Sequence, residues 1–541
     1  MQRVQGAMSV FPKNLESIPE PWQLPRQDLR SCLINGELRQ WDGPCQQVTS
    51  PICLSGPQGA QRIPLGSFPL LDATTALDAL TAAVKAYDHG RGDWPTLSVA
   101  ERISHVAAFN ARLRACRTEV VRLLMWEIGK SLVDAQKEFD RTVTYIDDTI
   151  DALKDLDRTG SRFTIVDGII GQIRRAPLGV ALCMGPFNYP LNETLTTLIP
   201  ALIMGNTSVF KPPRHGVLLF APLLEAFRDS FPPGVVNAIF GAGRTIIPPL
   251  MASGEVDVFA FIGTSGAADS LQKVHPRPHR LRLVLGLEAK NPAIVLPDAD
   301  LDQAVRECVA GALSFNGQRC TALKIIFVHK AVAEPFVAAL AAAVAALPGG
   351  LPWDAGVAIT PLPEEGKPEI LSEMIADAVA KGARVVNADG GATEKTLFTP
   401  AVVYPVTAEM RLYEEEQFGP VMPVVTFSDV SEPINYMTAS CYGQQVSLFG
   451  RDPVTMARLI DPLVNQVSRV NLNSQCQRGP DVFPFTGRKD SAVATLSVSD
   501  ALRAFSIRTL VATRENEANK TLLREIVHER HSNFLSTDYL F

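Results

Sequence analysis

The chain has 541 residues, too many for a single hydrophobic core, so about two to four domains of roughly 100–200 residues are expected. Hydrophobic residues make up 46% and charged residues 20%, which is typical of a soluble globular enzyme. The formal net charge of −6 is small for this length. It gives no extended charged surface for nucleic acid or an anionic membrane, which disfavours both as partners.

Nine cysteines are spread along the chain, and no two form a C-x-x-C pair. Their odd number and scattered spacing argue against a disulfide framework and a zinc site, so we expect no metal and a reducing, cytoplasmic location. The N-terminal segment has no apolar stretch typical of a secretory signal. The longest strongly apolar run, Phe336 to Leu347, has 12 residues and is too short to cross a bilayer.

The predicted elements change character along the chain. Residues 1–35 are expected to be an irregular lead-in with scattered proline. Residues 73–160 are expected to be helical, because apolar residues recur there at three- and four-residue steps. Asp167-Gly168, between apolar stretches that begin at Phe163 and end at Ile173, predicts a β-hairpin.

From Leu178 to Lys290 the predicted strands and helices alternate. The expected strands are 180–184, 208–210, 236–239 and 256–262, and the expected helices are 192–204, 218–227 and one from Gly266. A second alternation runs from 293 to about 470, and 488–513 is predicted to be strand-rich. Because such a rhythm implies parallel sheets covered by helices, the predicted fold class is α/β with two parallel-sheet units.

The segment Phe315-Asn316-Gly317-Gln318-Arg319-Cys320-Thr321 places a cysteine beside an arginine in a turn of small residues. Because a nearby cation lowers the pKa of a thiol, Cys320 is a candidate activated nucleophile. A buried structural cysteine explains the same residues, so the segment alone leaves both interpretations open.

Three further segments follow predicted strands, where side chains of a parallel sheet face the ligand crevice. Gly185-Pro186-Phe187-Asn188-Tyr189-Pro190 offers an amide for a developing oxyanion, or a plain turn before proline. Phe210-Lys211-Pro212-Pro213-Arg214 offers cations for a ribose and its 2′-phosphate, or a solvated basic loop. Ile262-Gly263-Thr264-Ser265-Gly266 offers backbone N–H groups for a pyrophosphate, or an ordinary helix cap.

Taken together and in this order, the segments PFNYP, FKPP, FIGTSG, GQRC and EEQFGP resemble those of the aldehyde dehydrogenase superfamily, from about Ile34 to about Thr513. Within that superfamily, QCQRGPDVFPF from Gln475 to Phe485 is similar to the substrate loop of the NADP-dependent non-phosphorylating glyceraldehyde-3-phosphate dehydrogenases. The resemblance implies a Rossmann-like cofactor domain, a catalytic domain and a small β oligomerisation flap.

The resemblance also implies a role for each matching residue. Cys320 would be the nucleophile, and Asn188 would hold the oxyanion together with the backbone N–H of Cys320. The cofactor would be NADP, because Arg214 stands where NAD-preferring members often carry Glu, and a guanidinium suits a 2′-phosphate. The implied cofactor contacts are Lys211, Arg214, Gly263, Thr264, Glu416 and Phe418. The implied contacts to a substrate phosphate are Arg141, Tyr189, Arg319 and Arg478.

The segment Leu285-Gly286-Leu287-Glu288-Ala289-Lys290 departs from the family's Glu-Leu-Gly-Gly-Lys, whose Glu activates the water that hydrolyses the thioester. Gly286 replaces that Glu, and Glu288 replaces the first Gly. In an extended segment both face the same side, roughly 6–7 Å apart, so Glu288 is a candidate displaced base. The alternative is that Glu288 supports the fold or contacts the cofactor, and that the base is missing.

Three functions stay open on the sequence. The first is NADP-dependent, irreversible oxidation of D-glyceraldehyde 3-phosphate to 3-phosphoglycerate, through a thiohemiacetal and a thioester on Cys320. The second is oxidation of another anionic aldehyde or semialdehyde, with water or a different acyl acceptor such as coenzyme A. The third is a cofactor-binding protein whose turnover is impaired because Gly286 replaces the base.

The resemblance also gives the predicted domain boundaries and assembly. Residues 36–157 and 175–288 would form the NADP-binding domain, 289–488 the catalytic domain, and 158–174 with 489–514 the oligomerisation flap. Residues 1–35 and 515–541 would be an N-terminal extension and a C-terminal tail. Because exposed flap strands must be paired or covered, a homodimer or homotetramer is expected.

Overall fold

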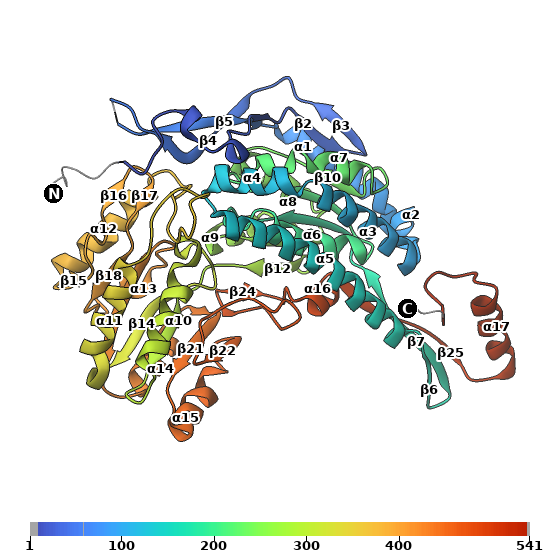
Figure 1. Cartoon of the computed structure of the whole chain (residues 1–541). Helices are drawn as coiled ribbons and strands as arrows, with labels where there is room; N and C mark the ends of the chain where they lie inside the picture. The colour runs from blue at the N-terminus through green and yellow to red at the C-terminus, as the bar shows by residue number, and fades with distance from the viewer. Residues whose placement is uncertain (1–8, 58, 538–541) are drawn as a thin grey trace.

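The structure is a computed structural model that describes residues 9–57 and 59–537. Two of the sheets within these residues are large, one of eight strands and one of seven. Figure 1 shows the two large sheets in separate halves, a smaller N-terminal sheet along one edge, and a thin flap that projects from the body. None of the helices in the described ranges is long and apolar enough to cross a membrane.

The first large sheet has the order β24-β12-β11-β8-β9-β10-β2-β3. Its centre is buried and parallel, as is typical of a sheet covered by helices. The parallel strands are β12 (Arg282–Gly286), β11 (Val258–Ile262), β8 (Val180–Met184), β9 (Thr207–Lys211) and β10 (Val236–Ala238). Antiparallel strands extend the edges: β24 (Ala492–Val493) pairs with β12, and β2 (Ser31–Ile34) pairs with β10 and β3 (Glu37–Gln40).

The helices of this half include two that position the site. The long α5 buries apolar residues at three- and four-residue steps, and α6 is buried on every side, so it is a core helix. The helices are α1 (Ala73–Tyr87), α2 (Asp93–Thr96), α3 (Val99–Ala115), α4 (Arg117–Ile128), α5 (Leu132–Gly160), α6 (Asn192–Ile203), α7 (Leu223–Arg228), α8 (Gly243–Ala252), α9 (Ser265–Lys273) and α16 (Val498–Ala504).

The second large sheet is parallel except for its edge strand β15. Its order is β15 (Arg384–Val385), β18 (Ala401–Tyr404), β19 (Val421–Phe427), β14 (Leu323–His329), β13 (Asn291–Val295), β21 (Gln445–Phe449) and β22 (Arg469–Leu472). Its helices are α10 (Leu301–Leu313), α11 (Ala333–Ala345), α12 (Lys367–Ala380), α13 (Arg411–Glu414), α14 (Ser431–Ala439) and α15 (Pro453–Leu463). The short segment between β12 and β13 passes directly from one large sheet to the other and carries Glu288.

Smaller elements complete the chain. The N-terminal sheet contains β1 (Gln27–Asp28), β5 (Gln61–Pro69) and β4 (Cys45–Leu54). The flap is an antiparallel sheet of β25 (Ser506–Arg514), β7 (Ile169–Pro177) and β6 (Phe163–Val166), and α17 (Glu517–His528) follows it. Two short pairs are β16 (Thr393–Glu394) with β17 (Leu397–Phe398) and β20 (Tyr442–Gly443) with β23 (Arg488–Lys489).

The α/β class with two parallel sheets and the Asp167-Gly168 hairpin are confirmed. Two local predictions were wrong. The described part of residues 1–35 contains β1 and β2 and is not uniformly irregular. The expected helix 218–227 breaks around Pro222, which has no N–H to continue it, into a 3₁₀ turn and α7. The segment 488–513 contains β23, β24 and most of β25, as a strand-rich segment should, and also α16, which was not predicted. β24 joins the first large sheet.

Candidate active site

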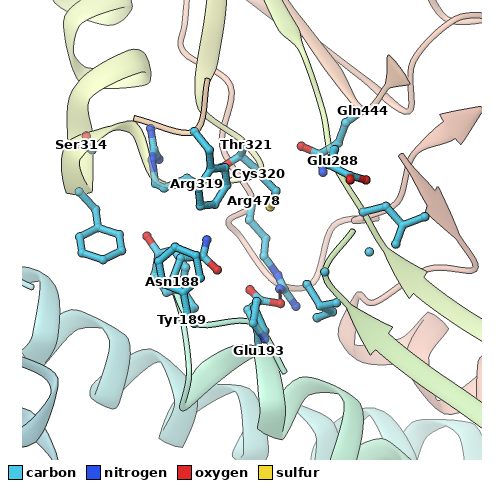
Figure 2. A pocket seen from close by; sticks show the side chains of 18 of the residues that line it. Asn188, Tyr189, Glu193, Glu288, Ser314, Arg319, Cys320, Thr321, Gln444 and Arg478 are labelled. Carbon is cyan, nitrogen blue, oxygen red and sulfur yellow. Dashed lines mark ion pairs between the residues drawn. The ribbon is translucent and has the colours of Figure 1, made fainter. Parts of the chain in front are cut away.

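A cavity of about 800 Å³ lies between the two large sheets (Figure 2). The first sheet presents the carboxyl ends of β8, β11 and β12 to it, and the second presents the amino ends of β14, β19 and β21. Most of the site residues predicted from the sequence line this cavity: Arg141, Asn188, Tyr189, Gly263, Thr264, Glu288, Arg319, Cys320, Glu416, Phe418 and Arg478. Lys211 and Arg214 lie outside its lining.

Cys320 follows a tight turn that the fold holds in a strained conformation. Phe315 and Asn316 have φ angles of 47° and 55°, values that side chains other than glycine seldom adopt. The Asn316 amide secures the turn, because its Nδ2 donates to Thr360 Oγ1 at 3.1 Å and its Oδ1 accepts from Thr360 N at 2.9 Å. A Cβ at Gly317 would lie 2.7 Å from the carbonyl oxygens of Ala312 and Gly419, so the backbone packs too closely there for a larger residue.

The electrostatics around Cys320 differ from the prediction. Burial raises the pKa of the Cys320 thiol above its ordinary value, and the Glu193 carboxylate adds to the rise. The opposing cations are Lys324, whose Nζ also donates to the Cys320 carbonyl oxygen at 3.0 Å, and Arg478. The neighbouring Arg319 turns away and donates to the carbonyl oxygens of Ala310 and Gly311, at 3.3 and 2.7 Å. Of the two interpretations that the sequence left open for this segment, the contacts of Arg319 do not support activation of the thiol by this guanidinium.

Asn188 lies in the loop between β8 and α6, opposite Cys320. Its Nδ2 donates to the carbonyl oxygen of Gln318 at 2.9 Å, which aims the amide at the cysteine turn. The backbone carbonyl oxygen of Asn188 accepts a hydrogen bond from Lys130 Nζ at 2.8 Å. Lys130 is fully buried, pairs with Glu138 and lies 3.6 Å from the ring centre of Tyr189, so this cation fixes the loop and the tyrosine together.

The two distal arginines meet on one carboxylate. Arg141, on α5, donates from Nε and Nη2 to Asp481 at 2.7 and 2.6 Å, and Nε of Arg478 lies 3.3 Å from the same carboxylate. Burial opposes ionisation of Asp481, but the two guanidinium groups hold the pKa of this carboxyl below its usual range. Arg478 also stacks 4.5 Å from the ring centre of Phe485 and forms an ion pair with Glu193. At this end of the cavity, the positive charges of Arg141 and Arg478 are therefore already balanced by the carboxylates of Asp481 and Glu193.

The opposite end of the cavity carries the residues expected to meet a dinucleotide. Thr264 caps α9 with its side chain, 3.4 Å from Ala267 N. Glu416 pairs with the buried Lys324 and accepts from Ala289 N at 3.2 Å, and Phe418 packs edge-on against Phe187 at 5.9 Å.

Farther along the first sheet, Lys211 ends β9 and donates from Nζ to Pro212 O at 2.9 Å, and burial lowers its pKa to about 8. Arg214 is exposed in the following loop. The Lys211 ammonium and the start of α8 lie close together, since a Cβ at Gly243 would be 3.8 Å from Lys211 Cε. Cations and the start of α8, which no side chain caps, suit the phosphates of a dinucleotide, so the residues fit such a cofactor.

Glu288 points to the start of α9. Its Oε2 accepts from Ser265 N at 2.8 Å, and its Oε1 lies 3.5 Å from Ser265 Oγ. This N–H is one of the donors that a pyrophosphate at α9 would use, so the carboxylate occupies the anion position of that helix. Of the two roles left open for Glu288 by the sequence, this geometry favours contact with the cofactor side.

Several residues of the site gave no signal in the sequence. Glu193, Lys130 and Lys324 form ion pairs in or beside the cavity, yet each is an isolated charged residue in an apolar or loop segment. Lys324 follows Cys320 by four residues and Glu193 follows Asn188 by five, and this proximity was the only hint in the sequence.

Comparison with known proteins gives a family match over most of the chain. The sequence pattern of the aldehyde dehydrogenase family matches residues 56–511. A similar protein is the NADP-dependent glyceraldehyde-3-phosphate dehydrogenase of Streptococcus equinus, 33% identical over 448 residues that cover 82% of this chain and 91% of the relative. The protein of the same name from Nicotiana plumbaginifolia is 33% identical over 416 residues, which cover 75% of this chain and 82% of the relative.

Solved structures agree with the sequence comparison. The NADP-dependent glyceraldehyde-3-phosphate dehydrogenase from Bacillus halodurans C-125, complexed with NADP, superposes with a TM-score of 0.82 at 31% identity, covering 90% of this chain and all of that one (100%). Lactaldehyde dehydrogenase from Escherichia coli superposes with a TM-score of 0.82 at 26% identity, covering 91% and 100%.

Proposed function

The chain belongs to the aldehyde dehydrogenase family, and within that family we propose that it oxidises D-glyceraldehyde 3-phosphate to 3-phosphoglycerate with NADP. The observation that carries the proposal is the shared cavity, in which Arg141, Arg319, Arg478 and Tyr189 gather at one end and Cys320 lies within reach. Relatives at 31–33% identity carry the name of this activity, which supports the same substrate class.

The chain's own residues account for the first half of the reaction. The Cys320 thiolate attacks the aldehyde carbon to give a thiohemiacetal. The Asn188 amide, already aimed at the cysteine turn, donates to the oxyanion together with the backbone N–H of Cys320. A nicotinamide cofactor, when bound, would supply the hydride acceptor, and loss of hydride from the substrate carbon would leave a thioester on Cys320. Water then releases the acid, which requires a base.

The NADP preference rests on the basic residues beyond the cavity. Lys211 and Arg214 offer two cations where an acidic residue would select the ribose hydroxyls of NAD. Gly263 and Thr264 begin the helix that would face the pyrophosphate, and Glu416 with Phe418 would contact the nicotinamide ribose. A structural relative of the same fold is complexed with NADP, which supports this assignment.

A second substrate class follows from the charge balance. Asp481 and Glu193 already neutralise Arg141 and Arg478, which leaves Arg319 without an ion pair in the described ranges. One guanidinium group without an ion pair is enough to bind a substrate with a single negative charge, such as the carboxylate of a semialdehyde. The phosphorylated aldehyde remains the first proposal because Arg141, Arg319, Arg478 and Tyr189 all line one cavity.

The predicted domain boundaries, location and assembly are also kept as proposals. The flap exposes Ile165, Val166, Ile507 and Leu510 on its strands, and such a surface needs a partner, for which a second copy in a homodimer or homotetramer is proposed. The nine cysteines are all free, which supports a reducing, cytoplasmic location.

An assay with three substrate conditions tests the function. NADP and NAD reduction are measured with D-glyceraldehyde 3-phosphate, with succinic semialdehyde and with no aldehyde. The proposal requires the highest kcat/KM for the phosphorylated aldehyde with NADP. A higher value for the semialdehyde would select the second substrate class. Tight NADP binding without reduction by any aldehyde would exclude an enzymatic role.

A further inference from the structure

Glu193 is a buried carboxylate that faces the reaction cavity, with no part in the cofactor contacts proposed above. It lies in the first turn of α6, five residues after Asn188, and its side chain is 8% exposed. Because α6 is buried on every side, the backbone that carries Glu193 is held rigidly. Figure 2 shows Glu193 on the floor of the cavity, on the same side as Asn188, with its carboxylate turned toward Arg478.

The two oxygens of Glu193 are bound differently. Oε2 forms the ion pair with Arg478 and lies 3.5 Å from Thr196 Oγ1. Oε1 receives no hydrogen bond from any residue in the ranges 9–57 and 59–537. An ionised carboxylate removed from bulk water still needs donors for its lone pairs, so Oε1 is the atom available to accept from a water molecule in the cavity.

Both members of this ion pair act on the nucleophile. The charges of Glu193 and Arg478 are each felt at the Cys320 thiol, with opposite effects on its pKa. All three residues line the same cavity. A water that donates to Oε1 of Glu193 would therefore lie in the same cavity as the acyl group on Cys320.

Three other carboxylates that line the cavity are engaged. A fourth, Glu364, has one buried oxygen without a hydrogen bond, but it is Glu193 whose charge is felt at the Cys320 thiol. Glu138 accepts from Lys130 and from the backbone N–H groups of Leu191 and Asn192, and Glu416 pairs with Lys324. Glu288 is held by Ser265 at the start of α9. The position where the family carries its base is Gly286, although a Cβ there would only touch Ile262 at 3.4 Å, so packing does not forbid a side chain.

We propose that Glu193 is the general base of the deacylation step, a role that rests on the proposed thioester at Cys320. Water attacks the thioester carbon while its proton passes to Oε1 of Glu193. The new C–O bond forms, the C–S bond breaks, and its electron pair leaves on Sγ. The carboxylic acid departs, and the proton on Glu193 returns to the thiolate or to solvent. Arg478 fixes the carboxylate through the other oxygen, and no further reactant is needed.

The test separates acylation from deacylation in rapid-mixing measurements on the full-length protein. Glu193→Gln keeps the size of the side chain and removes the base. The NADPH burst of up to one equivalent per subunit should persist, and the steady-state rate should fall about 10²–10⁴-fold, the usual contribution of a general base. Because the Glu193 charge raises the pKa of the Cys320 thiol, the pH profile of the burst should also move to lower pH in this variant.

Chemical rescue distinguishes a base from a structural residue. Glu193→Ala leaves the Arg478 guanidinium without its partner, so added formate should raise the steady-state rate in a saturable way and leave the parent unchanged. Hydroxylamine, a nucleophile that attacks thioesters without a base, should restore turnover to Glu193→Gln. If Glu193→Gln fails to fold, Glu193→Asp with the same readouts decides the question, with an intact burst and a smaller loss of turnover expected.

Two comparison variants and the parent separate the outcomes. Glu415→Gln removes an exposed carboxylate at the rim, paired with Arg411, and should leave both phases unchanged. Glu288→Gln should alter the Kd for NADP without changing the ratio of steady-state to burst rate.

An unchanged steady-state rate in Glu193→Gln, or a lost burst that neither formate nor hydroxylamine restores, would overturn the base assignment alone. A parent without any burst would instead overturn the proposed function.

Discussion

Removal of Arg141 should weaken recognition of the substrate phosphate without unfolding the protein. The Arg141 side chain is 25% exposed on α5. After the substitution, its bidentate partner Asp481 would still form an ion pair with Arg478, so no buried carboxylate is left unpaired. Methionine preserves the helix propensity and most of the side-chain length in Arg141→Met. A hydrogen bond to a charged group contributes roughly 1.5–3 kcal/mol, so kcat/KM for D-glyceraldehyde 3-phosphate should fall about 10- to 150-fold.

The assay compares the phosphorylated aldehyde with unphosphorylated D-glyceraldehyde, both with saturating NADP. The loss should appear only with the phosphorylated substrate, because the unphosphorylated one makes no contact with this guanidinium. Arg114→Met, which removes an exposed ion pair with Asp147 of α5, is the matched control and should change neither value. An equal loss with both aldehydes, or no loss with either, would refute the phosphate assignment of Arg141.

Four further predictions concern the cofactor, the cysteine turn and the assembly. Arg214→Glu should lower the NADP-to-NAD ratio of kcat/KM at least about tenfold, measured by steady-state kinetics, since a carboxylate repels a 2′-phosphate. The Kd for NADP should rise faster than that for NAD between pH 7 and 9, measured by fluorescence titration, because Lys211, with its pKa of about 8, loses its charge. Asn316→Ala should reduce the burst rate without changing NADP affinity, because Thr360 no longer secures the turn; an unchanged burst would contradict this. Leu510→Lys should yield monomers in sedimentation, and unchanged assembly would exclude the flap as the interface.

The parts of the fold that the sequence predicted are those with a strong local pattern. The central strands of the first sheet are short apolar runs followed by helices, such as Val180–Met184 before α6, and such runs specify a buried parallel sheet. The strands β4 and β5 were not predicted, because Pro51 and Pro64 interrupt their alternation and the bulged pairing is visible only in three dimensions. Similarly, the segment 218–227 has the apolar content of a buried helix, but Pro222 divides it into a 3₁₀ turn and α7.

The site shows the same limit. Short segments located Cys320 and Asn188, because each lies in a compact group of residues between two elements. The ion pairs of Glu193 with Arg478 and of Lys324 with Glu416 join segments far apart in the chain, and no local pattern reports them. Arg319 illustrates the opposite error: it is adjacent to Cys320 in sequence, yet its guanidinium binds the end of α10, so adjacency was a poor guide to the charge at the thiol.

Oxidation of D-glyceraldehyde 3-phosphate in phosphate-free buffer, followed by NADPH absorbance and by assay of the acid product, tests the central claim most directly. The account predicts one NADPH and one 3-phosphoglycerate per aldehyde consumed, faster with NADP than with NAD, and no product with Cys320→Ser. Turnover that requires added phosphate, or that persists in Cys320→Ser, would contradict a thioester at Cys320 hydrolysed by water.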